Sequence, residues 1–277
     1  MDHSAEQAYA LASEWPLPVR EVAYKLIRCT EHREVLWEEA GVYLQRKPYL
    51  VSTNPDLDTS SYVIRVEVTE QPPPIIPLAF GDCLQQLRSA LDYLAWHLVI
   101  ANGGIPSGTP SPGRRPTQFP ILYRQSEKGI DVAGGVSPEA LAIIEGLQPY
   151  HRPAKDGRPV VQDPLYILND LARRDRHRMV HLVAFGGRAG QSLHFPEEGI
   201  EIPFPPPGLA LDDGAEIVVP VEPRLLKCQV QVKGISTMYV ALEEPGYEGM
   251  MREVGGIVSR IYDYLFADVI PQFLRFF

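Results

Sequence analysis

The sequence predicts an α+β protein, in which a bundle of about four long helices carries an inserted β-hairpin and a small C-terminal antiparallel sheet. Three observations predict this class. Apolar residues recur at helical spacing in four long stretches, period-two segments flank a turn-rich stretch at about 48–70, and short strand-like segments follow one another over about 200–243. A chain of 277 residues can bury a substantial core, and we expect one domain over residues 1–277.

Four long helices and one short helix are expected, and local signals mark several of their ends and bends. We expect these helices over Val19–Gln45, Leu78–Asn102, Pro164–Ala184 and Gly249–Phe276. Asp163 stands where an N-cap residue would open the third helix, and Pro271 should bend the last one. A shorter helix, Glu139–Gly146, is expected after Ser137 and Pro138, because serine caps helices and proline suits the first helical position.

Strands are expected in two regions. Tyr49–Ser52 and Ser61–Thr69 flank a turn and should form the hairpin. The strands of the small C-terminal sheet are expected at Ile200–Ile202, Glu216–Val219, Lys227–Val232 and Thr237–Leu242. The stretch Gly103–Thr117, made almost wholly of Gly, Pro, Ser, Thr and Arg, should be an exposed loop.

Composition excludes several classes of function. The chain has 35 acidic and 26 basic residues and a formal net charge of -9, so a broad nucleic-acid-binding surface is not expected. Three distant cysteines, no signal-peptide pattern and no long apolar run favour the cytoplasm, without a membrane partner. The sequence has no phosphate-binding loop, no dinucleotide fingerprint and no nucleophile elbow, and we expect no cofactor.

Against this acidic background, residues 173–181 hold four arginines and two histidines. If Pro164–Ala184 is one helix, a single polar face unites Asp170, Arg174, His177, Arg178 and His181. Such a cluster predicts a local site for an anion, because guanidinium groups match phosphate and carboxylate oxygens.

Two ion pairs are expected near this cluster. On the same helix drawing Asp175 turns toward the apolar side, where Arg88 is the candidate partner. The alternative is that Asp175 lies at a helix irregularity and reaches water. Arg88 and Asp92 are four residues apart on the second long helix, the spacing of a supporting salt bridge.

The spacing of arginine and histidine resembles the active-site motif of the HEPN superfamily, in which a histidine follows an arginine after four to six residues. Two arrangements fit, Arg176 with His181 and Arg174 with His181. On a regular helix Arg174 and His181 point about 20° apart, whereas Arg176 and His181 point about 140° apart. HEPN proteins are helical bundles, and many are metal-independent ribonucleases of toxin, CRISPR and phage-defence systems.

The resemblance implies specific roles for these residues. His181 would be the acid/base, Arg174 or Arg176 would stabilise phosphate charge, and His177 would assist. Arg178, Asp170 and Arg88 are the candidate substrate-binding residues. The implied partner is RNA or another phosphate- or carboxylate-bearing ligand, and the C-terminal helix would supply a homodimer interface.

A second resemblance covers more of the chain. Gly81–Trp96, Phe119–Ile121, Leu147–Tyr150 and Asp175–Arg178 are similar to a pattern in uncharacterised bacterial proteins. It implies no activity.

Other interpretations remain open. His177 and His181, four residues apart, could hold a metal together with Asp92, His97, His151 or Asp170. Arg174 and Arg178 beside them disfavour a divalent cation, and we expect no metal. The alternatives are a non-catalytic binding or scaffold protein, and a helical-bundle enzyme that acts on a small anionic substrate with a histidine-based metal site.

Overall fold

The computed structural model describes residues 13–108, 115–186, 191–204, 216–233, 238–247 and 253–277. By its internal contacts the chain divides into two compact units. Unit 1 comprises residues up to 36, residues 78–180 and residues 255–277, and unit 2 comprises residues 37–77 and 181–254. Each unit is described by itself, and the expectation of one domain over 1–277 stays a prediction.

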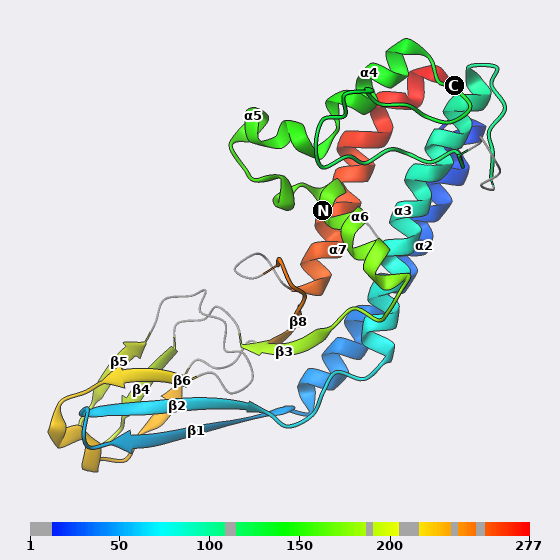
Figure 1. Cartoon of the computed structure of the whole chain (residues 1–277). Coiled ribbons are helices and arrows are strands. Elements are labelled where there is room, and N and C mark those ends of the chain that lie inside the picture. The colour runs from blue at the N-terminus through cyan, green and yellow to red at the C-terminus, as the bar shows by residue number, and fades with distance from the viewer. Residues whose placement is uncertain (1–12, 109–114, 187–190, 205–215, 234–237, 248–252) are drawn as a thin grey trace. The chain divides into compact units, whose positions relative to one another are not determined.

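Unit 1 is helical. Its elements in chain order, shown in Figure 1, are α2 (Leu17–Gln45, which continues into unit 2), α3 (Ile75–Ala101), α4 (Pro138–Gly146), α5 (Arg152–Asp156), α6 (Pro164–Asp175) and α7 (Val254–Asp263). Short 3-10 turns at Pro149–His151 and Val160–Gln162 join α4, α5 and α6. The apolar stripe expected on α3 is buried, with Phe80, Leu84, Leu87 and Leu91 fully enclosed.

The long helices α2 and α3 run side by side in opposite directions (Figure 1). Glu21 near the start of α2 lies 3.0 Å from His97 near the end of α3. Further along, Lys25 donates to Gln86 over 3.2 Å, and His32 lies 3.6 Å from Asp82 near the start of α3. These contacts fix the antiparallel register of the pair.

The caps predicted for two helices are confirmed. The side chain of Ser137 accepts a hydrogen bond from the backbone N–H of Ala140 at the start of α4. The carboxylate of Asp163 accepts from the N–H groups of Leu165 and Tyr166 at the start of α6. Both caps satisfy donors that a helix leaves unpaired in its first turn.

The C-terminal helical run changes its winding before the proline. α7 is followed by a π-helical turn at Tyr264–Val269 and a 3-10 segment at Ile270–Phe276, which contains Pro271. The apolar side chains of this run are buried: Ile257, Val258, Ile261, Tyr262, Leu265, Val269, Ile270 and Phe273. This face is used inside the fold, so a homodimer formed through this helix would need its remaining surface. The expected start at Gly249 lies outside the described residues.

The described residues of unit 2 form three small antiparallel sheets. The hairpin β1 (Tyr49–Asp56) and β2 (Ser61–Val68) is confirmed, and β6 (Glu216–Pro220) pairs with β2. A second sheet has the order β5 (Ile200–Phe204), β4 (Gln191–Phe195) and β7 (Gln231–Lys233). The third pairs β3 (Leu182–Gly186) with β8 (Met238–Leu242).

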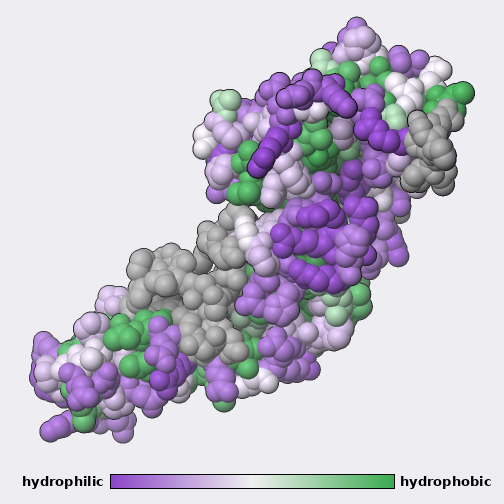
Figure 2. All heavy atoms as spheres, in the orientation of Figure 1, coloured by the Kyte–Doolittle hydropathy of each residue, from purple (hydrophilic) through white to green (hydrophobic). Residues whose placement is uncertain are grey.

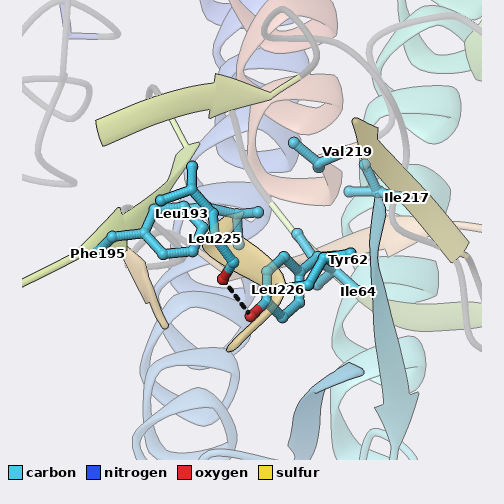
Figure 3. Packing of buried hydrophobic residues seen from close by; sticks show 8 residues of the cluster. All are labelled: Tyr62, Ile64, Leu193, Phe195, Ile217, Val219, Leu225 and Leu226. Atoms are coloured by element: carbon cyan, nitrogen blue, oxygen red, sulfur yellow. Dashed lines mark hydrogen bonds between the residues drawn. The ribbon is translucent and has the colours of Figure 1, made fainter. Parts of the chain in front are cut away.

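An apolar core joins the first two sheets of unit 2 (Figure 3). Its buried members are Tyr62, Ile64, Leu193, Phe195, Ile217, Val219, Leu225 and Leu226. The hydroxyl of Tyr62 donates to the carbonyl of Leu225 over 3.1 Å, which ties β2 to the 3-10 turn Pro223–Lys227. The two three-stranded sheets therefore share one hydrophobic centre.

The α+β class is confirmed, but only part of the expected four-helix bundle is found. Among the described residues α2 has 29 residues and α3 has 27, and the C-terminal run is helical over Val254–Phe276 with three kinds of winding. The third expected helix stops at Asp175. The single C-terminal sheet over about 200–243 is wrong, because its strands are distributed over three sheets. Which strand a given strand pairs with depends on residues distant in sequence, so its own sequence does not determine the partner.

The expected helix Pro164–Ala184 fails in its second half. The N–H groups of His177 and Arg178 both bond to the carbonyl of Arg174, which closes a turn after α6. The apolar run that begins at Leu182 then pairs with β8 as strand β3. A short apolar run has the same composition in a helix and in a buried strand. Here pairing with a strand distant in sequence decides the outcome, since Leu182 lies opposite Leu242.

No helix in the described part of the chain combines the length and the apolar character that crossing a membrane requires.

Candidate anion-binding site

The basic cluster forms an exposed turn at the C-terminal end of α6. Arg176, His177 and Arg178 are all exposed, and hydrophilic residues make up most of the surface around α6 in the space-filling view (Figure 2). Arg176 donates from Nε to the carbonyl of Ala172 over 3.3 Å, and Arg178 donates from Nη1 to the carbonyl of Met179 over 3.1 Å. We call these three residues the basic turn.

Arg174 and Asp170 are brought together, as the shared helix face predicted. The Nε of Arg174 donates to Oδ2 of Asp170 over 2.9 Å, and Arg173 donates to Oδ1 over 3.2 Å. Asp170 is buried, and its carboxylate pairs with the guanidinium groups of both arginines on the same helix. The two arginines thereby offset the charge of a carboxylate that would otherwise be costly to bury.

His181 does not share a helix face with Arg174, because α6 ends six residues earlier. It belongs to unit 2, where its Nδ1 lies 2.8 Å from Oε2 of Glu243 and its side chain is 62% exposed. Its backbone N–H donates to Glu244, and its carbonyl accepts from the N–H of Glu243. The angular argument that favoured Arg174 with His181 over Arg176 with His181 no longer applies.

Arg88 is the buried centre of the region around α3. Its Nη1 lies 2.9 Å from Oδ1 of Asp92, as the four-residue spacing predicted, and its Nη2 donates to the carbonyl of Phe119 over 2.9 Å. The N–H of Phe119 in turn donates to Oδ1 of Asp92 over 2.9 Å. This closed set of contacts fastens the segment around Phe119 to α3.

Asp175 faces α3, but its partner is not Arg88. Its Oδ2 accepts a hydrogen bond from Nε2 of Gln85 over 2.9 Å, and the same amide donates to the carbonyl of Ala172. The carboxylate lies directly over Gly81, where a Cβ atom would overlap it. The predicted pair with Arg88 is therefore wrong, because Arg88 is held one turn further along α3 by Asp92.

A cavity of about 300 Å³ opens beside Arg88. Its polar side chains and its aromatic wall come from α3, from residues 115–133 and from α6. We call it the cationic cavity, lined by Arg88, Arg115, Gln118, Phe119, Asp131 and Asn169. Arg115 lies 2.9 Å from Asp131 with both side chains mostly exposed, so solvent weakens that pair.

The electrostatics of this cavity couple it to the basic turn. Burial lowers the pKa of Arg88, the carboxylate of Asp92 opposes this shift, and the nearby guanidinium of Arg176 adds to it. Burial likewise raises the pKa of Asp92, against the pull of Arg88, of the Phe119 N–H and of Arg176. Both shifts disfavour charge, so the pair only partly offsets its own desolvation.

A metal site is not assembled by the described residues. Within them, no group of three or more His, Cys, Asp and Glu side chains is close enough to hold an ion. Two of the proposed extra ligands are engaged with other carboxylates, His97 with Glu21 at 3.0 Å and His151 with Glu145 at 3.2 Å.

Comparison with models of protein families, with curated proteins and with solved structures finds no match for this chain. The fold and the site geometry therefore carry the functional argument.

Sequence reasoning missed the residues that complete the cationic cavity. Arg115 and Gln118 come from a proline-rich segment with no periodic signal, and Asn169 is one polar residue among several on α6. Among the polar lining residues, the sequence predicts a site role for Arg88, through its spacing to Asp92 and as a candidate partner of Asp175. Tertiary placement of the segment 115–121 on α3 brings the others together.

Proposed function

We propose that this protein binds a phosphate-bearing ligand, with RNA as the leading candidate, through the basic turn and the neighbouring cationic cavity. The observation that carries the proposal is the cationic cavity, whose wall holds the mostly buried Arg88 and the exposed Arg115. The exposed Arg176 is near enough to Arg88 to contribute to the lowering of its pKa, after burial, which is the main cause. Two guanidiniums held together repel each other, and an anion between them would relieve that repulsion.

The position of Arg88 in the wall of the cationic cavity supports the same proposal. Its guanidinium is mostly buried and is held by Asp92 at 2.9 Å and by the carbonyl of Phe119 at 2.9 Å. Guanidinium groups bind phosphate oxygens through charge-assisted hydrogen bonds. Asn169 adds an amide at the same cavity, where its Nδ2 donates to the hydroxyl of Tyr123 over 2.9 Å.

The proposed binding is local. The chain as a whole is acidic, so only a few phosphates can be neutralised at once. For single-stranded RNA the logarithm of the binding constant should fall with the logarithm of salt concentration with a slope of about -0.7 per phosphate contacted. A slope corresponding to about two or three contacts is expected.

The experiment is a titration of labelled single-stranded RNA by fluorescence anisotropy. Arg176→Ala should weaken binding about tenfold and remove about one contact from the salt slope. Arg28→Ala is the matched control, because Arg28 is an exposed arginine of unit 1 that is paired with Glu31. Absence of binding by the wild type at low salt, or equal affinities of the two variants, would remove the proposal.

Cleavage of the bound RNA, as in a HEPN-like metal-independent ribonuclease, is the second candidate. One observation in unit 1 favours it. His177 is exposed beside Arg176, and an imidazole can exchange protons near neutral pH. RNA incubated with the wild type in the presence of EDTA should then be cleaved, and His177→Ala should cleave it at least about a hundredfold more slowly. RNA that stays intact over a broad pH range would leave binding without catalysis.

A further inference from the structure

A second cavity, of about 380 Å³, lies along the C-terminal half of α3 within unit 1. Its residues come from α2, from α3 and from the segments on both sides of the gap at 109–114. We call it the aromatic cavity, lined by Glu21, Asp92, Tyr93, Trp96, His97, Gly108 and Thr117. Its volume suits a small ligand.

Two aromatic side chains, Tyr93 and Trp96, line this cavity. Tyr93 and Trp96 are three residues apart on α3 and lie on one side of the helix. Position 108 opposite them is glycine, and a Cβ atom there would stand 3.8 Å from Cζ3 of Trp96. The lack of a side chain at 108 keeps that edge of the indole open to the cavity.

The Tyr93 ring already accepts one cation. The ammonium of Lys25 lies 5.1 Å from the ring centroid, and Gln86 holds it there over 3.2 Å. This distance is within the range of a cation–π contact. The Tyr93 ring is therefore accessible to a cation.

The charged groups that line the aromatic cavity are acidic. Glu21 is 60% exposed, with Oε2 3.0 Å from Nε2 of His97. Asp92 is held through Oδ1 by Arg88 and by the N–H of Phe119. No lysine or arginine is among the described residues that line this cavity, in contrast to the cationic cavity.

We propose that the aromatic cavity binds a small organic cation of the alkylammonium or quaternary ammonium class. Aromatic faces attract such a cation through their quadrupoles, and the mostly exposed carboxylate of Glu21 adds Coulomb attraction. An anion would be repelled by Glu21. A neutral apolar ligand would bury this carboxylate without compensating it. The proposal is independent of phosphate binding, since Trp96 and Glu21 line the aromatic cavity and not the cationic cavity.

The test compares choline with its neutral isostere 3,3-dimethylbutan-1-ol by isothermal titration calorimetry on the full chain. Choline should bind at least about tenfold more tightly, because the two molecules share their shape and differ in charge. Trp96→Leu should weaken choline binding about tenfold or more, and Glu21→Gln should weaken it several-fold. Trp37→Leu and Glu34→Gln are the matched controls, as both residues lie on α2 outside the lining.

Glu21→Gln keeps the proposal falsifiable if Trp96→Leu does not fold, since the Glu21 side chain is mostly exposed. Equal affinity for choline and its isostere would overturn the proposal. The proposal is also overturned if choline does not bind at millimolar concentrations, or if Glu21→Gln binds choline as tightly as Glu34→Gln does. Arg176→Ala should bind choline normally, so a loss of RNA binding in that variant separates the failure of one site from the failure of the other.

Discussion

The carboxylate of Asp175 lies directly over Gly81, close enough that a Cβ atom at position 81 would overlap it. This contact joins the last residue of α6 to the first third of α3, and the hydrogen bond from Gln85 to Asp175 secures it. A helical glycine is ordinarily a weakness, but here its missing side chain makes room for a neighbour.

Gly81→Ala should therefore destabilise the protein, by about 1–3 kcal/mol, because an added methyl group must displace the carboxylate. Gly41→Ala is the control. Gly41 is also a helical glycine, nothing lies within 4 Å of its Cβ position, and alanine should stabilise the fold there by about 0.5–1 kcal/mol. Urea unfolding monitored by circular dichroism measures both. If the two variants shift the midpoint in the same direction, the overlap has no energetic importance.

Asp92 should make an unusual contribution to the pH dependence of stability. Burial raises its pKa in the folded state above the ordinary 3.8, so between these two values the folded chain binds more protons than the unfolded chain. The stability contributed by this group therefore rises as pH falls through that window and is lost as pH rises through the raised pKa. Asp92→Asn cannot titrate at this position and lacks this contribution.

The measurement is the free energy of unfolding of the wild type and of Asp92→Asn at pH 7 and at about pH 4, close to the ordinary pKa of aspartate. The difference between them should move in favour of the wild type on acidification. A difference that moves the other way would show that Arg88 and the Phe119 N–H together outweigh desolvation.

The hydroxyl of Tyr62 should contribute measurably to the core of unit 2. Tyr62→Phe removes its hydrogen bond to the carbonyl of Leu225 and should cost about 1 kcal/mol. Tyr49→Phe is the control, because Tyr49 packs partly buried against the same cluster and its hydroxyl makes no hydrogen bond with a described residue. Thermal unfolding of both should give a lower Tm for Tyr62→Phe only, and equal Tm values would contradict the prediction.

The two helix caps should differ in strength. Asp163→Ala removes the oxygen that accepts from two backbone N–H groups and a buried carboxylate 3.7 Å from Arg152, and should cost about 2 kcal/mol. Ser137→Ala removes one N–H acceptor and should cost about 1 kcal/mol. Asp163→Asn keeps an oxygen at the cap and should lose less than Asp163→Ala. The measurement is the free energy of unfolding of each variant. If Ser137→Ala lowers it the most, the result contradicts this prediction.

Local sequence signals predicted the elements whose causes are local. The amphipathic stripes of α2 and α3, the caps Ser137 and Asp163, the hairpin and the Arg88–Asp92 pair all depend on residues within a few positions of one another. Propensity, capping and side-chain spacing act over that range, so the sequence alone determined these features.

The remaining features depend on partners distant in sequence. Leu182 lies in a strand because β8 pairs with it, and Asp175 selects Gln85 because Gly81 lets the two helices approach. Whether an apolar run becomes a helix or a strand, and which buried charge finds which partner, depends on desolvation and pairing across the fold. Only the tertiary structure decided these points. It ended α6 at Asp175, assigned His181 to the other unit, and placed Arg115 and Asn169 beside Arg88.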